Sequence, residues 1–220
     1  MGARSMKTIL CYGDSNTWGT ATRPGVDERY APHERWPGIL QLELDSGWTV
    51  IAEGLPGRTT VHPDPIEGYW LDGSAYLHPC LRSHRPLDAV AIMLGTNDLK
   101  QRFHVDSGDI AGGIGALLAI VRKSESGPRG EVPKMLVICP PPILQQHGEL
   151  TRFDDMFRGG YEKSLRLAPL YAEVAREHGA AFLNAGDFIQ SSRFDGIHLD
   201  PDAQSAIGRG VAGKVRDLGW

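Results

Sequence analysis

The sequence predicts an α/β fold, a three-layer α/β/α sandwich around a five-stranded parallel sheet. A chain of 220 residues suits one full-sized domain, which we expect to span residues 1–220. Short apolar runs recur along it, each long enough for a buried parallel strand and too short for a helix. Segments with helical spacing separate these runs, and this alternation implies right-handed parallel crossovers.

The five apolar runs are the predicted strands, at 8–12, 49–52, 89–94, 135–139 and 181–183. The predicted helices cover 36–44, 74–82, 110–123, 165–178 and the segment after Pro201. Asp200–Pro201 is typical of a helix start, and His178–Gly179 is typical of a helix end. Pro169 lies inside the fourth helical pattern, so that helix either kinks or begins there.

Composition limits the partners. The chain has 23 Lys and Arg against 27 Asp and Glu, a formal net charge of -4, which leaves no basic footprint for nucleic acid or an anionic membrane. We therefore expect a small-molecule substrate, with neither nucleic acid nor membrane as a partner. The apolar run at 8–12 is too short for a signal peptide, and no run approaches the roughly 18 residues of a membrane span.

The three cysteines are widely spaced and form no C-x-x-C pair, which favours a reduced, cytoplasmic location. Cys11 and Cys139 are expected to be small buried hydrophobes. We find no metal-ligand spacing between any histidine outside the candidate site and a second His or Cys, and we assign these histidines no role.

Four short polar blocks are the candidates for chemistry: Gly13–Asp14–Ser15, Gly54–Thr59, Gly95–Asp98 and Asp195–His198. The first three come directly after predicted strands, and the fourth lies late in the chain. Ligands of an open parallel sheet gather at the carboxyl ends of its strands. We therefore expect all four blocks to face one crevice.

Ser15 is the candidate nucleophile, because a serine that follows a strand and a glycine lies in a sharp strand-to-helix turn from which its side chain projects. His198 is the candidate base, and Asp195, three residues earlier, is placed to orient the imidazole. Attack on an ester also builds an oxyanion. Asn97 offers a side-chain amide for it, and Ser15 and Gly57 offer backbone N–H groups.

In this order, the blocks resemble those of the SGNH (GDSL) hydrolases. The resemblance covers most of the chain and implies a flavodoxin-like sheet, the roles just given for Ser15, Gly57, Asn97, Asp195 and His198, and no cofactor or metal. The longer context resembles the arylesterase/acyltransferase branch in the segments Gly13–Gly19, Glu53–Leu55, Arg58–Thr60 and Leu94–Asp98. That branch acts on small acyl esters, with acyl transfer and perhydrolysis as side activities, and it often forms homo-oligomers.

The first turn departs from the best-known acyltransferases of that branch. Those enzymes have a large apolar residue directly after the nucleophile and an aromatic residue two positions past the tryptophan. This chain has Asn16 and Thr20 there. The turn is therefore more polar, and we expect hydrolysis to outrun acyl transfer.

The residues expected to line the substrate pocket are Asn16, Trp18, Leu55, Thr96 and Ile197. Asp14 is expected to be structural, accepting hydrogen bonds from backbone amides in its turn. Three segments either line the active site or contact a neighbouring subunit: the proline run 140–142, the residues 153–157 and the segment 54–73.

Three other functions compete with this one. A carbohydrate or other natural-product acetylesterase would use the same residues. A flavodoxin-like module binding phosphate or a nucleotide is disfavoured, because the G-x-x-x-x-G-K-[ST] and G-x-G-x-x-G patterns are absent. A metallohydrolase would need Asp14, Asp98, Asp195 and His198 as ligands.

Overall fold

A computed structural model describes residues 6–22, 28–146 and 152–220. Five parallel strands form one sheet, as predicted, and their order is β2-β1-β3-β4-β5. They are β1 (Lys7–Gly13), β2 (Trp48–Gly54), β3 (Ala89–Met93), β4 (Lys134–Cys139) and β5 (Ala181–Asn184). All strands end at the same edge, so the polar segments that follow them lie together.

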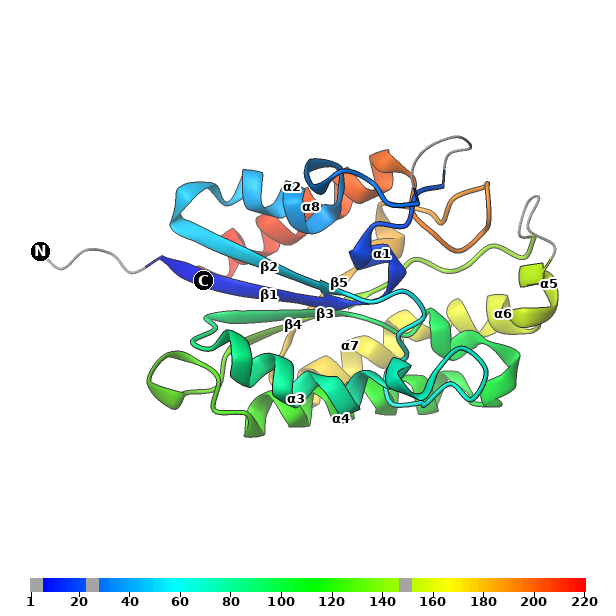
Figure 1. Ribbon diagram of the computed structural model, residues 1–220, viewed down its shortest axis with the longest axis horizontal. Helices are drawn as coiled ribbons and strands as arrows, with labels where there is room; N and C mark the ends of the chain where they lie inside the picture. The colour runs from blue at the N-terminus through cyan, green and yellow to red at the C-terminus, as the bar shows by residue number, and fades with distance from the viewer. Residues whose placement is uncertain (1–5, 23–27, 147–151) are drawn as a thin grey trace, which may run out of the picture.

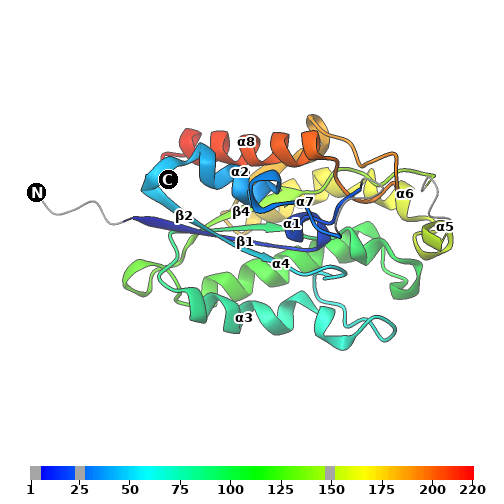
Figure 2. The ribbon, with the colours of Figure 1, turned by 45° about the horizontal axis from the view of Figure 1, so that its top comes forward.

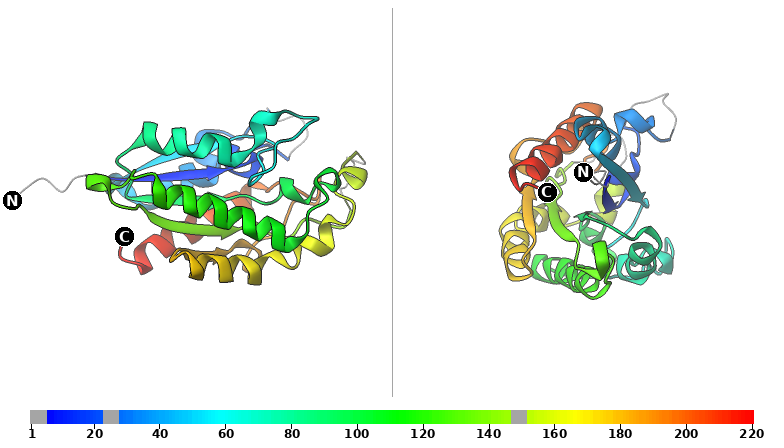
Figure 3. Two further views of the ribbon diagram at one scale, coloured as in Figure 1. Left: turned by 90° about the horizontal axis from the view of Figure 1, so that it is seen from below. Right: turned by 90° about the vertical axis from the view of Figure 1, so that its left-hand side faces the viewer.

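Helices cover both faces of the sheet (Figure 1), which confirms the three-layer α/β/α architecture. One face carries α2 (Trp36–Glu43) and α8 (Pro201–Asp217). The other carries α3 (Gly73–His84), α4 (Ser107–Lys123) and α7 (Leu167–Glu177), which lie side by side in Figure 3. Figure 2 shows the short helices α1 (Ser15–Trp18), α5 (Arg152–Met156) and α6 (Gly160–Ser164) towards the carboxyl end of the sheet.

Short 3-10 helices complete the described part of the chain: Pro32–Glu34, Asp45–Gly47, Tyr69–Leu71, Asn97–Leu99, Gln101–Phe103, Pro128–Gly130 and Ala185–Asp187. None of the helices in the described ranges has the length and apolar character that a membrane crossing needs.

Successive side chains of β1 point alternately into two apolar cores, one on each face of the sheet. Leu10 and Tyr12 point towards the α3, α4 and α7 face, whereas Ile9 and Cys11 point towards the α2 and α8 face, and all four are fully buried. Cys139 is also buried, so the expectation that both cysteines act as small hydrophobes is confirmed.

The main helices agree with the sequence pattern to within a few residues. Helix α4 begins at Ser107, three residues early, because Asp106 and Asp109 form a capping box at its N-terminus. Pro169 is the third residue of α7, so that helix begins there rather than kinking. Asp200 is the N-cap residue of α8, but its carboxylate accepts hydrogen bonds from the hydroxyls of Thr22 and Ser192 instead of capping the helix.

Candidate active site

The turn after β1 places Ser15 at the first position of α1. Asp14 caps this helix, because its Oδ1 accepts a hydrogen bond from the Asn16 N–H at 2.9 Å, which confirms its structural role. Gly13 is required here: a Cβ at this position would lie 2.1 Å from the Thr17 Oγ1 and 2.8 Å from the Met93 carbonyl oxygen. Burial raises the pKa of Asp14 to about 6.

Ser15, His198 and Asp195 form a continuous hydrogen-bonded chain. The Ser15 Oγ lies 3.0 Å from the His198 Nε2, and the His198 Nδ1 lies 2.6 Å from the Asp195 Oδ2. The other carboxylate oxygen of Asp195 accepts hydrogen bonds from the backbone N–H groups of Ile197 and His198. The Asp195 Oδ1 therefore holds the loop 195–198 in place, and the Asp195 Oδ2 orients the imidazole of His198.

Asp195 is only 2% exposed, yet it favours its charged form. Burial alone would raise the pKa of this carboxyl. The hydrogen bond and charge of His198, together with the two backbone amides, outweigh burial and hold the pKa below its ordinary value. Asp195 is therefore a carboxylate at neutral pH, ready to stabilise an imidazolium on His198.

The candidate oxyanion donors lie beside Ser15. Asn97 begins a 3-10 helix directly after the β3 turn, and its Nδ2 donates to the Arg58 carbonyl oxygen at 3.1 Å. Gly57 adopts a φ of 84°, a conformation that favours glycine. Ser15, Gly57 and Asn97 all line one cleft, as the sequence led us to expect.

Asp98 anchors the oxyanion loop, a role that sequence reasoning missed. Its buried carboxylate accepts hydrogen bonds from both the backbone N–H and the hydroxyl of Thr60. Thr60 follows the turn whose Arg58 carbonyl holds the Asn97 amide. The neighbouring residues Asn97 and Asp98 thus tie the loop after β3 to the loop after β2.

The cleft has a volume of about 530 Å³. Its apolar lining residues are Trp18, Phe153, Met156, Phe157 and Ile197. Its charged lining residues are Glu28, Glu67 and Lys100, and the Lys100 ammonium donates to the Glu67 carboxylate at 2.8 Å. These charged residues were not predicted, because 28, 67 and 100 belong to loops that meet only in the folded chain.

The expected pocket residues divide into two groups. Trp18 and Ile197 line the cleft, whereas Asn16, Leu55 and Thr96 are not among its described lining residues. Asn16 is 2% exposed, and its Nδ2 donates to the Ile197 carbonyl oxygen at 3.4 Å, so it braces the loop before His198 instead of facing substrate. The Leu55 N–H continues the pairing of β2 with β1 by donating to Gly13.

The two candidate wall segments have different positions. Phe153, Met156 and Phe157 of the 152–157 region line the cleft, as do Pro56, Gly57 and Glu67 of the segment 54–73. The proline run 140–142 is not among the described lining residues. Its Pro142 carbonyl accepts a hydrogen bond from Ser191, and the Leu144 N–H donates to Gly196, so this run supports the loop that carries Asp195.

The four ligands that a metallohydrolase would need, Asp14, Asp98, Asp195 and His198, do not form a metal-binding group within the described ranges. Among groups of at least three His, Cys, Asp or Glu side chains close enough to share an ion, the described residues contain only Glu53, Cys80 and His84. Asp14 caps a helix, Asp98 holds Thr60, and Asp195 holds His198.

The chain is similar to known esterases. The model of the GDSL-like Lipase/Acylhydrolase family matches residues 11–206. No curated protein matches the sequence significantly. Among solved structures, the carbohydrate acetylesterase Est24 from Sinorhizobium meliloti is 41% identical, with a TM-score of 0.91 over 96% of this chain and 99% of that one.

Two further similar structures are arylesterases by description. The native aryl esterase of M. smegmatis is 40% identical, with a TM-score of 0.90, and covers 96% of this chain and 99% of its own. A putative arylesterase from Agrobacterium tumefaciens str. C58 is also 40% identical, with a TM-score of 0.84 and the same coverage.

Proposed function

The chain belongs to the GDSL-like lipase/acylhydrolase family, and we propose that it hydrolyses small acyl and aryl esters through an acyl-enzyme formed on Ser15. It is a carboxylic ester hydrolase. The observation that carries the proposal is the hydrogen-bonded chain from Ser15 through His198 to Asp195. The proposal includes a cytoplasmic location and a small-molecule ester as substrate; a homo-oligomer is compatible with it.

In the first step, the Ser15 Oγ attacks the ester carbonyl carbon while the His198 Nε2 takes its proton. Negative charge then develops on the carbonyl oxygen, where the Asn97 amide and the backbone N–H groups of Ser15 and Gly57 act as donors. The leaving alcohol receives the proton from His198. The acyl group is left on Ser15.

In the second step, water attacks the acyl-enzyme. His198 removes a proton from this water and returns it to the Ser15 Oγ as the acid leaves. The Asp195 carboxylate orients the imidazole in both steps and stabilises its charged form. The residues that carry both steps all come from the described part of the chain.

The partition of the acyl-enzyme tests this mechanism. Acetate esters with three different leaving groups, p-nitrophenyl, phenyl and ethyl acetate, are hydrolysed with methanol at one fixed concentration. If all three form the same acetyl-Ser15, the ratio of methyl acetate to acetic acid is the same for each. A ratio that changes with the leaving group would exclude a common acyl-enzyme.

The same measurement tests the balance between hydrolysis and transfer. We expect hydrolysis to exceed transfer, because Thr20 and the charged groups Glu28, Glu67 and Lys100 line the cleft and favour water. Asn16 does not face the cleft, so Thr20→Phe is the informative variant and is expected to raise the transfer ratio. Transfer that outruns hydrolysis in the parent enzyme would contradict this expectation.

Removing the Asn97 amide should weaken stabilisation of the oxyanion. Asn97→Ala is expected to lower kcat by roughly 10²- to 10³-fold, with a small change in KM, because the interaction strengthens as charge develops. Steady-state kinetics with p-nitrophenyl acetate give both constants. The half-buried Asn184, which ends β5 and donates a hydrogen bond to Asp187, supplies the control Asn184→Ala. Equal kcat values for the two variants would refute the assignment of Asn97.

A second candidate substrate is an acetylated carbohydrate, and the charged residues of the cleft favour it. The Glu67 carboxylate, whose side chain is 35% exposed, supplies a hydrogen-bond acceptor for sugar hydroxyls, whereas the apolar lining residues suit an aryl group. Est24, at 41% identity, is described as a carbohydrate acetylesterase. An acetylated sugar would therefore use the Glu67 carboxylate as a hydrogen-bond acceptor, whereas an aryl ester would not.

Glu67→Gln separates the two classes. Loss of a hydrogen bond to a charged group is expected to lower kcat/KM for acetylated glucose by about tenfold or more, while p-nitrophenyl acetate changes far less. The exposed Glu177 supplies the control Glu177→Gln. Absence of activity on the acetylated sugar in the parent enzyme, or equal losses on both substrates, would leave the small aryl ester as the substrate class.

A further inference from the structure

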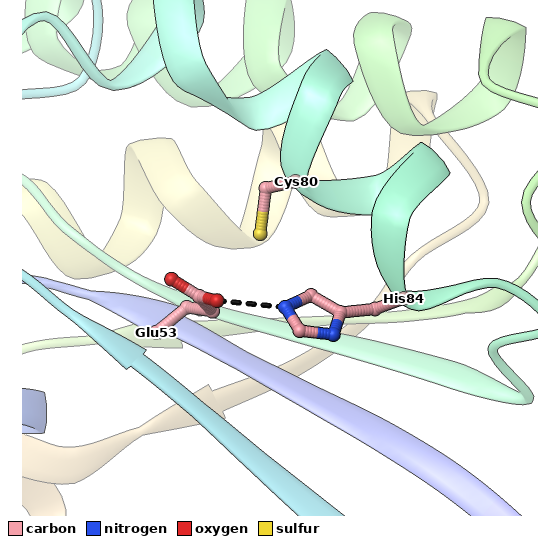
Figure 4. A group of neighbouring side chains, drawn as sticks. All are labelled: Glu53, Cys80 and His84. Atoms are coloured by element: carbon pink, nitrogen blue, oxygen red, sulfur yellow. Dashed lines mark hydrogen bonds and ion pairs between the residues drawn. The ribbon is translucent and has the colours of Figure 1, made fainter.

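A second group of reactive side chains lies at the edge of the sheet, outside the catalytic cleft (Figure 4). Glu53 comes from β2, and Cys80 and His84 come from α3. The Glu53 Oε1 lies 2.7 Å from the His84 Nε2, and the Cys80 sulfur points towards the gap between them. One ligand atom of each residue lies within 4.8 Å of those of the other two.

The fold accounts for this convergence. Cys80 and His84 are four residues apart on α3, so they share one face of the helix. β2 is an edge strand, and Glu53 lies on its side facing α3. The sulfur is buried, with Cys80 1% exposed, whereas the side chains of Glu53 and His84 are 22% and 31% exposed. The group therefore has one closed side and one side open to solvent.

We propose that Glu53, Cys80 and His84 bind a borderline-soft divalent cation of the zinc class, with water completing a tetrahedral site. Thiolate, imidazole and carboxylate are the three protein ligands that zinc takes. In a tetrahedral zinc centre such ligand atoms are about 3.3 to 3.6 Å apart, given bond lengths of about 2.0 to 2.3 Å. Binding thus requires the Glu53 Oε1 and the His84 Nε2, now 2.7 Å apart, to separate slightly.

The surroundings of Cys80 hold its thiol in the protonated form until a metal binds. Burial first, and then the charge of Glu53, raise the pKa of Cys80 to about 12, while Arg58 opposes them. The metal-free thiol is therefore protonated. Arg58 stacks on Tyr12 with its guanidinium carbon 4.1 Å from the ring centroid, and on Tyr76 at 5.7 Å. Metal binding forms a metal–sulfur bond and releases the thiol proton to solvent.

None of the three side chains has a part in the ester chemistry derived above. Glu53 does adjoin the loop of the oxyanion hole, since its carbonyl oxygen and that of Gly13 accept hydrogen bonds from Arg58. A metal would link β2 to α3 next to this loop. The three ligands come together only in the folded chain. A metal that binds them is therefore expected to stabilise the folded state against unfolding.

Cobalt titration of the reduced, chelator-treated full chain tests the site. We expect one Co²⁺ per chain, with a thiolate-to-cobalt charge-transfer band, displacement by Zn²⁺, and a rise in Tm with either ion. Cys80→Ser should abolish the band. His84→Gln and Glu53→Gln should each weaken metal binding by more than about tenfold. Loss of a residue that only hydrogen-bonds a metal ligand typically costs 10- to 100-fold in affinity, and loss of a ligand itself should cost at least as much.

Two variants serve as matched controls. Cys139→Ser replaces another buried thiol, and His78→Gln replaces an exposed histidine of the same helix. Both should keep the band and the affinity. His84 is part-exposed, so His84→Gln tests the site even if Cys80→Ser fails to fold. The proposal is overturned if the parent chain gives no thiolate band with Co²⁺, or if His84→Gln binds as tightly as the parent.

Discussion

Ser15→Ala is expected to lower kcat for p-nitrophenyl acetate by roughly 10⁶-fold, the scale of losses in other Ser-His-Asp hydrolases. Without Oγ there is no group to form the acyl-enzyme, and His198 has no hydroxyl to deprotonate. The residual rate then reflects water attack on a substrate held beside the oxyanion donors.

The fold should tolerate this change. Ser15 occupies the first position of α1, where its Oγ bonds His198 and the cap comes from Asp14 instead. Ser107 supplies the matched control, because it is likewise the first residue of a helix capped by an aspartate. Ser107→Ala should leave kcat unchanged. A Ser15→Ala enzyme that retains more than about a tenth of the parent kcat would exclude Ser15 as the nucleophile.

Asp195→Asn is expected to lower kcat by about 10⁴-fold with little effect on KM. The asparagine oxygen can still accept the backbone N–H groups of Ile197 and His198, so the loop should keep its shape. Its amide, however, donates to the His198 Nδ1, which moves the imidazole proton to Nε2. That nitrogen then cannot accept the proton of Ser15.

Kinetics and circular dichroism on this variant separate catalysis from folding. The exposed Asp202 at the start of α8 supplies the control Asp202→Asn, which should retain the parent kcat. Combining Ser15→Ala with Asp195→Asn should cost no more than Ser15→Ala alone, because the residues act as a unit. An unchanged kcat in Asp195→Asn would remove Asp195 from the mechanism.

Three of the four catalytic blocks were predictable because each comes soon after a short apolar run that the sequence marks as a strand. Ser15 and Asn97 come directly after β1 and β3, and parallel strands deliver such residues to one edge. Asp195 and His198 do not follow a strand directly. Their pairing was predictable from their local spacing and from the order of the four blocks, and the structure joins them to Ser15.

The rest of the site depends on side-chain directions and long loops. Asn16 follows the nucleophile in sequence, yet its side chain turns inward to the Ile197 carbonyl and not into the cleft. Glu67 and Lys100 meet across a loop whose path no local pattern predicts. Tertiary packing therefore decides which polar groups face the substrate.

Cys80 and His84 were not predicted to form a pair, although the two residues are four positions apart. The predicted helix 74–82 stopped short of His84, whereas α3 runs through it, despite Pro79 in its middle. His84 thus lies one turn after Cys80 on the same face, and Glu53 joins them only because β2 pairs at the sheet edge. The sequence shows the spacing of Cys80 and His84, but it does not show that Glu53 lies beside them.

The mechanism requires Ser15 to be the hydroxyl that His198 and Asp195 activate. Its most direct test is labelling of the full chain with a serine-directed fluorophosphonate, followed by mass spectrometry of the digested protein. We predict one adduct per chain, located on the peptide that contains Ser15 and absent from Ser15→Ala. An adduct on any peptide lacking Ser15, or inactivation without modification of Ser15, would exclude Ser15 as the nucleophile.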